Sequence, residues 1–305
     1  MKQKKHLFLL IFILIIFSLN AAAEVIKSEI VYAKLTAEGE VEHLFVVNGF
    51  ESDQQSQVVD YGKYREVQQL GMAQEFSYED DAVRFNVQPG RFFYEGIPDD
   101  LRLPWQITLK YRLDGEEITP QALLGENGQL EIILNIKPEK GFEAYTEAIT
   151  LQATLTLDGD HSFHVTSEKA TMAWAGGNIQ LSFILLPGQE ATYTVNTAIK
   201  NFQTLDLQAA GIKMAMDTQM YKDVAKKALA GSPLENAVGG LMENFLKAMQ
   251  GGSSPSFMDE RNQTDSLQFV MMLQGIPIPQ QEPEEIKTQE DTKTVWDRLK
   301  DLVGL

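Results

Sequence analysis

Alternation of apolar and polar residues along most of the chain predicts a succession of short β-strands. Near the start, Ile30–Leu35 and Val41–Asn48 flank the turn-like segment Thr36–Gly39, and this pattern predicts a β-hairpin. The clearest strand is Trp105–Leu113, which alternates throughout and ends at Asp114–Gly115, a dipeptide typical of tight hairpin turns. Further segments with strand-like patterns are Val83–Val87, Arg91–Tyr94, Gln129–Ile136, Ala148–Leu157, Phe163–Val165, Ala170–Trp174, Ile179–Leu185 and Ala191–Thr197.

Glycine and proline separate these segments at regular intervals, for example at Asp158–Gly159, Gly176–Gly177 and Pro187–Gly188. Many short strands with regular turn signals indicate an antiparallel sandwich, and the absence of an exact repeat period argues against a solenoid. We therefore expect a mainly β protein with an antiparallel β-sandwich architecture, a short helical insertion and an amphipathic C-terminal tail.

The strand pattern gives way to a helical one near Asp217. Ser232-Pro233-Leu234-Glu235 has the features of a capping box with proline at the first helical position, which predicts the start of a helix. Leu267–Leu273 then reads as a strand again. We expect this strand to pair with the one near Leu205–Met216, so that the helices form an insertion between them.

The pattern divides the chain into seven parts. They are a signal segment at 1–23, an N-terminal β region at 24–104, a β-sandwich at 105–216, a helical insertion at 217–256, a returning strand at 257–275, a disordered linker at 276–292 and an amphipathic tail helix at 293–305.

The tail is the strongest interaction signal in the sequence. It follows a segment rich in Pro, Gln and Glu and has no neighbouring core to join. Its apolar face predicts docking either back onto its own domain or onto a membrane surface or partner. The predicted contact residues are Val295, Trp296, Leu299, Leu302 and Val303.

The N-terminal segment has the three parts of a secretory signal peptide. Lys2, Lys4 and Lys5 precede the uncharged apolar run Leu7–Leu19, and Ala21–Ala23 offers a cleavage pattern of small residues. The apolar run is shorter than the roughly 20 residues of a membrane-spanning helix, which favours cleavage over retention as an anchor. We expect an exported protein that is extracellular or associated with the cell surface.

Charge and cysteine content exclude several classes of function. The net charge is −17, and loss of the three lysines of the signal segment would make it −20, so nucleic acid is not an expected partner. The chain has no cysteine, which excludes disulfides, thiolate catalysis and Cys-ligated zinc. A cysteine-free exported chain suits the outer face of a Gram-positive bacterium.

No motif predicts a cofactor, a metal or a catalytic site. His161 and His164 lie in a predicted strand, where positions three apart point to opposite faces, so they are interpreted as surface residues. The segment beginning at Asp158 resembles the start of a calcium loop, but Phe163 and Lys169 occupy positions that need Gly and Glu, which leaves a turn. The sequence lacks a nucleophile elbow, a phosphate-binding loop and a dinucleotide fingerprint.

Several short segments together carry a resemblance to a known family. They are Val31–Leu35 with Glu38–Gly39, Val46–Asn48 with Phe50–Glu51, Leu103–Trp105 with Tyr111 and Asp114–Gly115, Gly125 with Gly128 and Leu130–Ile132, and Ser256–Phe257 with Asn262 and Gln268–Val270. This arrangement resembles uncharacterised exported cell-envelope proteins of Gram-positive bacteria, related to the extracytoplasmic regions of YhgE/Pip-like membrane proteins. The resemblance implies an envelope protein that accompanies a membrane transport or secretion system. It transfers no catalytic residue.

These observations predict a non-enzymatic envelope module that binds a protein or surface component and needs no cofactor. The alternative is a secreted hydrolase acting on wall polymers or peptides. That alternative requires a pocket joining a histidine to carboxylates or a serine, so the positions of His43, His161 and His164 discriminate between the two.

Overall fold

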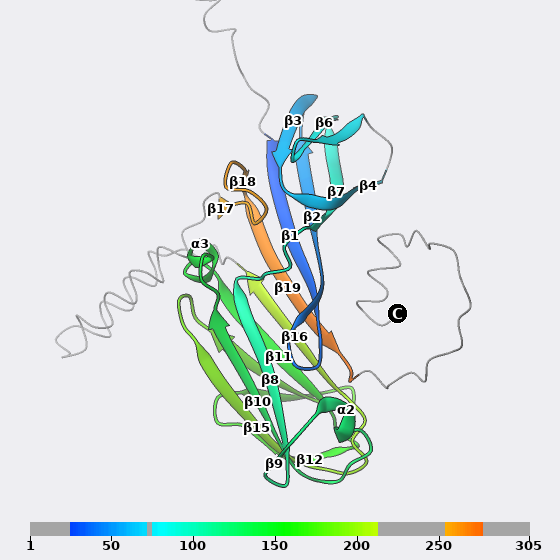
Figure 1. Cartoon of the computed structure of the whole chain (residues 1–305), viewed down its shortest axis with the longest axis vertical. Helices are drawn as coiled ribbons and strands as arrows, with labels where there is room; N and C mark the ends of the chain where they lie inside the picture. The colour runs from blue at the N-terminus through cyan, green and yellow to red at the C-terminus, as the bar shows by residue number, and fades with distance from the viewer. Residues whose placement is uncertain (1–24, 72–74, 213–253, 277–305) are drawn as a thin grey trace, which may run out of the picture.

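The computed structural model describes residues 25–71, 75–212 and 254–276, and these are almost entirely β-structure (Figure 1). The strands are β1 (Val25–Leu35), β2 (Val41–Ser52), β3 (Ser56–Tyr61), β4 (Tyr64–Leu70), β5 (Phe76–Glu79), β6 (Ala82–Val87), β7 (Gly90–Pro98), β8 (Trp105–Leu113), β9 (Glu116–Ile118), β10 (Gly128–Pro138), β11 (Thr150–Asp158), β12 (Ser162–Thr166), β13 (Thr171–Ala175), β14 (Asn178–Leu185), β15 (Ala191–Ile199), β16 (Leu205–Ile212), β17 (Ser254–Pro255), β18 (Gln263–Thr264) and β19 (Ser266–Gln274). Two short helices accompany them, α2 (Pro120–Leu123) and α3 (Glu143–Thr146). The mainly β fold class is confirmed.

A nine-stranded sheet extends through the whole described molecule. Its order is β13-β14-β11-β16-β19-β1-β2-β7-β4, and every neighbouring pair is antiparallel except β1 with β19, which run parallel. The long strands β1, β2 and β19 run from the upper to the lower half of the molecule (Figure 1). One continuous sheet therefore contains strands from both sides of the boundary predicted at residue 104.

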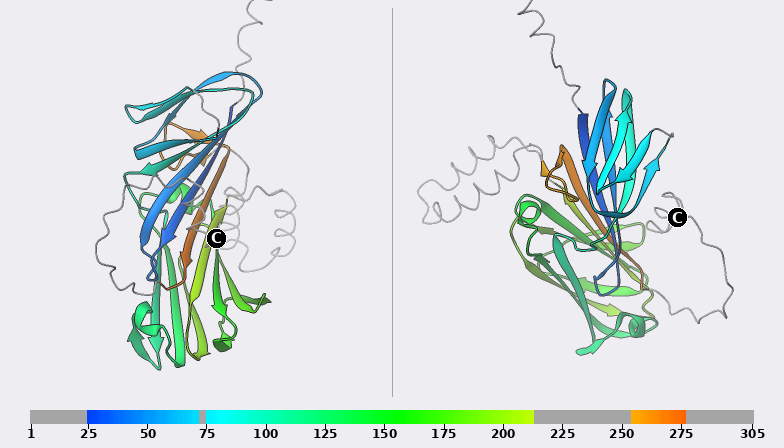
Figure 2. Two further views of the ribbon diagram at one scale, coloured as in Figure 1. Left: turned by 90° about the vertical axis from the view of Figure 1, so that its right-hand side faces the viewer. Right: turned by 45° about the horizontal axis from the view of Figure 1, so that its top comes forward.

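The lower half of the molecule in Figure 1, which contains β8–β16, is a β-sandwich, and the upper half contains β3–β7. A five-stranded sheet of order β12-β15-β10-β8-β9 lies over the β11, β16 and β19 part of the large sheet, and the turned views show these two layers (Figure 2). Inward-facing side chains alternate with outward-facing ones along each strand, so both sheets contribute to one apolar core. Leu155, Phe183 and Ile132 are among its fully buried members.

The upper half carries a smaller layer. The three-stranded sheet β3-β6-β5 packs against β2 and β7, and a second, largely aromatic cluster fills the space between them. Its buried members are Phe50, Tyr64, Val83, Phe85, Val87, Phe92 and Tyr94.

Several predicted pairings are present. β1 and β2 form the expected hairpin, and β16 pairs with β19 in antiparallel register as predicted. Asp114 and Gly115 both adopt positive φ angles of 50° and 92° in the turn between β8 and β9, as a tight hairpin turn requires.

Other expectations fall outside the described residues. The signal segment, nearly all of the helical insertion, the linker and the tail lie in 1–24, 213–253 and 277–305. Within the described ranges, no helix has the length and apolar character needed to cross a membrane.

Candidate functional site

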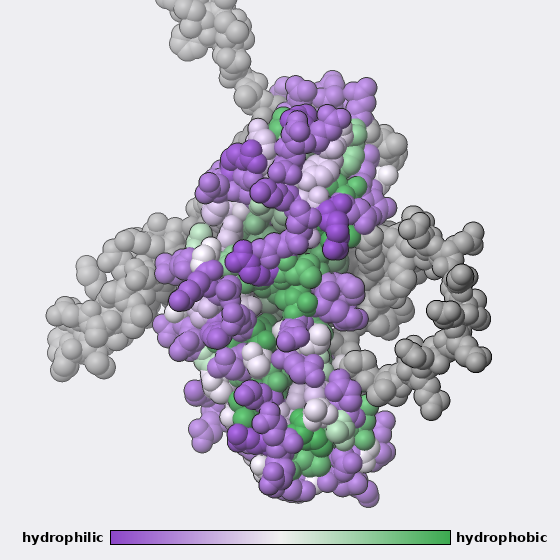
Figure 3. Space-filling view, viewed as in Figure 1, coloured by the Kyte–Doolittle hydropathy of each residue, from purple (hydrophilic) through white to green (hydrophobic). Residues whose placement is uncertain are grey.

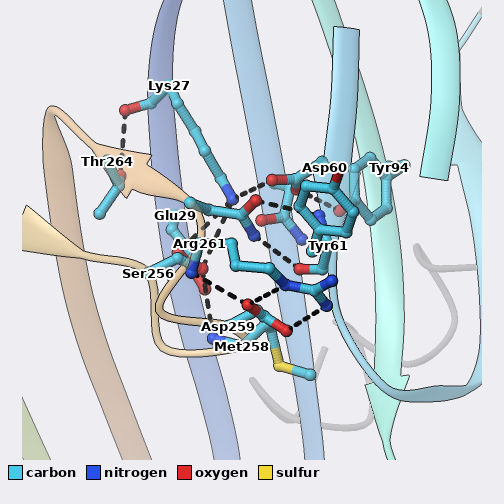
Figure 4. Close-up of polar contacts among 12 residues, drawn as sticks. Lys27, Glu29, Asp60, Tyr61, Tyr94, Ser256, Met258, Asp259, Arg261 and Thr264 are labelled. Atoms are coloured by element: carbon cyan, nitrogen blue, oxygen red, sulfur yellow. Dashed lines mark hydrogen bonds and ion pairs between the residues drawn. The ribbon is translucent and has the colours of Figure 1, made fainter. Parts of the chain in front are cut away.

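Buried charged groups gather where β1, β3 and the β17–β18 loop meet (Figure 4). Lys27 and Glu29 both lie on the inward face of β1, and Asp60 reaches them from β3. The exposed fractions of these three residues are 5%, 0% and 2%. Charged side chains are almost never buried to this degree unless they are paired, so this cluster is the most unusual chemical feature of the described chain. We call Lys27, Glu29, Asp60, Tyr94 and Ser256 the buried polar cluster.

Asp60 is the centre of the buried polar cluster. Its Oδ1 atom lies 2.6 Å from Lys27 Nζ, and its Oδ2 atom accepts a hydrogen bond of 2.5 Å from the Tyr94 hydroxyl. Both carboxylate oxygens therefore have strong donors, which offsets the desolvation of the charges. Lys27 Nζ also lies 3.5 Å from Ser256 Oγ.

Glu29 is less well satisfied than Asp60. Its Oε2 atom lies 3.9 Å from Lys27 Nζ, and neither carboxyl oxygen makes a hydrogen bond of ordinary geometry within the described part of the chain. Burial raises the pKa of Glu29 above its usual value, and the attraction of Lys27 opposes this only in part. Glu29 therefore keeps its proton to a higher pH than an exposed glutamate does.

Tyrosine hydroxyls extend the buried polar cluster towards the aromatic core of the upper half. The Tyr64 and Tyr94 hydroxyls lie 3.4 Å apart, and Asn48 Nδ2 donates to Tyr64 at 3.2 Å. Burial raises the pKa of both tyrosines well above the usual value, and the nearby Asp60 adds to the effect. The Tyr64 ring lies flat against Gly96, where an added Cβ would come within 2.3 Å of the ring. Because their pKa values are raised, the Tyr64 and Tyr94 hydroxyls stay protonated and can act as hydrogen-bond donors.

The β17–β18 loop closes over this cluster and is attached on two sides. On the β1 side, the Thr264 hydroxyl donates to the Lys27 carbonyl at 3.0 Å, and the Lys27 amide donates to Asp265 at 2.9 Å. On the β3 side, the Asn262 side chain accepts from the Tyr61 amide at 3.0 Å and donates to its carbonyl at 2.6 Å. These bonds join residues 201 to 238 positions apart in the chain.

A further contact lies on the surface of the same loop. The Arg261 guanidinium lies 3.9 Å from the centroid of the Tyr61 ring and pairs with Asp259 at 2.7 Å (Figure 4). This ion pair lowers the pKa of Asp259, chiefly through the hydrogen bond from Arg261.

The geometry assigns the buried polar cluster a structural role. Asp60 and Lys27 are paired with each other and enclosed, so neither is open to a substrate. Among the described residues, no group of three or more His, Asp or Glu side chains could hold a metal ion. The cluster holds the β17–β18 loop, which follows directly after residues 213–253, onto β1 and β3.

The histidines singled out in the sequence lie apart from this cluster. His43 is on β2, with an exposed ring 3.7 Å from Glu42. His161 precedes β12 in the other sheet, where its Nδ1 atom lies 2.9 Å from the Lys200 carbonyl oxygen, and His164 is exposed on β12. His161 also lies 3.9 Å from Asp158. The three histidines lie apart, on β2 and at two places around β12, which counts against the pocket that the hydrolase alternative requires. The predicted contact residues Val295, Trp296, Leu299, Leu302 and Val303 lie outside the described residues.

A groove of about 530 Å³ lies between the β1–β2 turn and the start of β8. Its floor includes the nearly buried Leu103, Trp105 and Ile107, and its rim includes Arg102 and Glu139. Hydrophobic side chains gather near the middle of this face (Figure 3). Arg102 is already paired with Asp100 at 2.7 Å, so the rim offers few free polar groups to orient a ligand.

Trp174, the most exposed large apolar residue of the described chain, lies on the edge strand β13 of the large sheet. All five residues of the edge strand β13 are exposed, including Trp174 at 72% and Met172 at 49%. Met172 and Trp174 pair in register with Leu181 and Ile179, so they lie on the core-facing side of the sheet, beyond the part that the second sheet covers. Trp174 lies beside the turn at Gly159, where an added Cβ would come within 2.7 Å of its ring.

The sequence predicts neither the buried polar cluster nor the position of β13 at the edge of the sheet. The members of the buried polar cluster lie on segments far apart in the sequence, and only the spacing of Lys27 and Glu29, in phase with the inward-facing Val31 and Ala33, hints that they are buried. It predicted β13 as a strand but not as an edge, because order within a sheet depends on pairing.

No protein-family model matches the chain, and no curated protein matches it. Similar solved structures include the Mu homology domain of Danio rerio Fcho1 with bound Eps15 peptide, with a TM-score of 0.42 at 10% identity over 83% of this chain and 96% of that one. The yeast delta-COP-I mu-homology domain has TM-scores of 0.36 alone and 0.33 with a Dsl1 WxWxV peptide, at 8% and 9% identity, over 84% of this chain and 96% of each of those chains. These scores are too low to carry an argument about fold or function.

Proposed function

We propose that this protein is an exported, non-enzymatic module of the cell envelope that binds an extended segment of a partner protein along the edge of β13. The observation that carries the proposal is the exposure of Trp174, at 72%, on an edge strand without a charged residue. The favoured partner segment is uncharged and extended.

Edge strands present unpaired backbone groups, and proteins usually protect them with charges, proline or bulges. β13 has the sequence Thr-Met-Ala-Trp-Ala and carries neither a charge nor a proline. An added strand would satisfy its free backbone groups, while Trp174 and Met172 would supply apolar contact area. Tryptophan is among the residues that most often dominate binding energy at interfaces.

The N-terminal signal pattern and the absence of cysteine support the envelope location. An association with a membrane transport or secretion system, which the family resemblance implies, is part of the proposal. The paired and enclosed state of Lys27 and Asp60 supports a role in binding over one in catalysis.

The test is photo-crosslinking in intact cells that express the full chain, with a photoreactive residue at Thr171. We expect one discrete crosslinked partner, and the Trp174→Ser/Met172→Ser double variant should reduce its yield at least about tenfold, as expected for loss of an interface hot spot. The partner's crosslinked segment, read by mass spectrometry, should be uncharged.

Ile184→Ser is the matched control. Ile184 is 64% exposed on the adjacent strand β14, and it lies on the opposite face of the sheet from Trp174. The control should keep the crosslinked species. Equal yields from the double variant and the unchanged protein, or equal losses in the double variant and the control, would contradict binding at β13.

A further inference from the structure

The outer face of the large sheet has two contrasting halves. Over β11, β14 and β16 the side chains facing away from the sandwich core are mostly polar, including Gln152, Thr154, Ser182 and Gln208. Over β19, β1 and β2 a group of apolar residues lies together near the middle of the strands, flanked by polar residues such as Ser28, Lys34 and Gln268. The apolar residues, which we call the outer stripe, are Ile30, Tyr32, Phe45, Val47, Val270 and Met272.

Strand register shows that the outer stripe is continuous. Tyr32 lies between Phe45 on β2 and Val270 on β19, and its ring stacks on Phe45 with centroids 5.0 Å apart. Ile30 lies opposite Val47 one step further along the same face. Their neighbours Val31 and Val46 point into the sandwich core, so alternation places the stripe on the other side.

An apolar stripe on the outside of a sandwich sheet needs a cover, because a face exposed to water is normally polar. Phe45 is only 5% exposed although it belongs to this outer face. Tyr32 is half-buried, and burial raises its pKa.

The geometry points to the tail, residues 293–305 of the same chain, as the segment that covers the outer stripe. The sequence predicts an amphipathic helix there, with Val295, Trp296, Leu299, Leu302 and Val303 on one face. A helix of thirteen residues is about 20 Å long. The stripe extends over three neighbouring strands, with two side chains two positions apart on each, so a helix of this length can cover it.

Chain connectivity brings this segment close to the stripe. β19 carries Val270 and Met272 on the stripe and ends at Gln274. Residues 276–292, the linker predicted from the sequence, then lead to the tail, and a random coil of 17 residues would have an end-to-end distance of about 20–25 Å. The tail is therefore held at a high effective concentration beside the outer stripe.

The absence of cysteine makes the test clean, because the only thiols are those introduced. In the full chain, Val47→Cys with Leu299→Cys should form an intramolecular disulfide under mild oxidation. The control pair is Thr154→Cys with Leu299→Cys, on the polar half of the same outer face. We expect the first pair to react at least about tenfold faster than the control, because docking raises the effective concentration at the stripe only.

A second measurement separates docking from simple tethering. Adding Trp296→Ser to the Val47 and Leu299 pair should slow its disulfide formation towards the control rate. Equal rates for the two pairs, with sedimentation of the full chain on phosphatidylglycerol vesicles, would assign the tail to a membrane. Disulfide-linked dimers in place of the intramolecular product would assign the stripe to a second copy. Either result would overturn the inference.

Discussion

The two halves of the molecule hold their layers together by different means. The lower sandwich is joined by a core of apolar side chains, such as Leu155 and Phe183, that are at most 1% exposed. The upper half combines an aromatic cluster with a buried ion pair between Lys27 and Asp60. The stabilisation from apolar burial depends on the buried area and changes little when side chains shift slightly. The stabilisation from an enclosed ion pair depends on the distance between its charged atoms and on their geometry.

The difference has a consequence for the loop between β17 and β18. An apolar contact would hold this loop near β1 and β3 in several similar positions. The hydrogen bonds that the Asn262 side chain exchanges with the Tyr61 backbone, and the one that Thr264 donates to the Lys27 carbonyl, select one position. The upper half therefore gains a defined attachment of the segment that follows residues 213–253. This attachment costs desolvation of three charged groups, which the lower half avoids.

Breaking the ion pair should have the largest effect. Asp60→Ala leaves Lys27 buried without its close partner and removes the acceptor of Tyr94, so we expect a loss of about 3–5 kcal/mol in the free energy of unfolding. Urea denaturation followed by circular dichroism measures it.

A second substitution separates this effect from that of an apolar cavity. Lys27→Met in the Asp60→Ala background removes the unpaired charge and should recover much of the loss. Leu155→Ala in the lower core should cost about 2–5 kcal/mol by leaving a cavity. If Lys27→Met left the Asp60→Ala variant as unstable as before, the unpaired charge would not be the cause.

Releasing the loop on one side should have an intermediate effect. Asn262→Ala removes two hydrogen bonds to the Tyr61 backbone and should cost about 1–3 kcal/mol. Hydrogen exchange at residues 256–264 should accelerate more than exchange in β10. Asn135→Ala, which removes an exposed hydrogen bond to Thr192, is the control and should change stability by less than about 0.5 kcal/mol. Unchanged exchange in the loop would contradict its attachment through Asn262.

Neutralising Glu29 should have the smallest effect, and it should be stabilising. Because the folded-state pKa of Glu29 is raised, the folded protein binds this proton more tightly than the unfolded chain does, and the contribution of Glu29 to stability falls as pH rises from 4.5 through the folded pKa. Glu29→Gln should therefore add about 1 kcal/mol at pH 8 and less at pH 4.5.

The difference in the free energy of unfolding between Glu29→Gln and the unchanged protein, measured at each pH, separates the effect of Glu29 from the effects of the other carboxyl groups. Asp259, whose pKa is lowered by Arg261, contributes stability that is lost as pH falls, which is the opposite sign. Glu42→Gln, at an exposed carboxyl paired with Lys34, is the control and should change stability by less than about 0.5 kcal/mol. A stability gain from Glu29→Gln that did not change with pH would exclude a protonation effect.

Much of the fold could be predicted from the period of the sequence. The segments Trp105–Leu113 and Gln129–Ile136 alternate cleanly because one face of each is buried, and both are strands. The sequence pattern predicts no strand within residues 56–70, although β3 and β4 lie there. Both strands carry polar side chains on both faces, so the alternation of apolar and polar residues is weak.

The candidate sites were harder to predict. The sequence predicts Trp174 as one more strand residue, and only the sheet order shows that β13 is an edge strand among the described residues. The outer stripe is likewise invisible in the alternation of β1, because Ile30 and Tyr32 gain meaning only beside Val47 and Phe45.

By itself the sequence determined that the chain forms strands, where many of them turn, and that cysteine chemistry plays no part. Local alternation and turn residues carry that information, because they act between neighbours in the chain. The tertiary structure decided which strands lie at an edge and which charged residues are enclosed. Lys27 meets Asp265 across 238 positions, and no local pattern can encode a contact that exists only once both segments share one sheet.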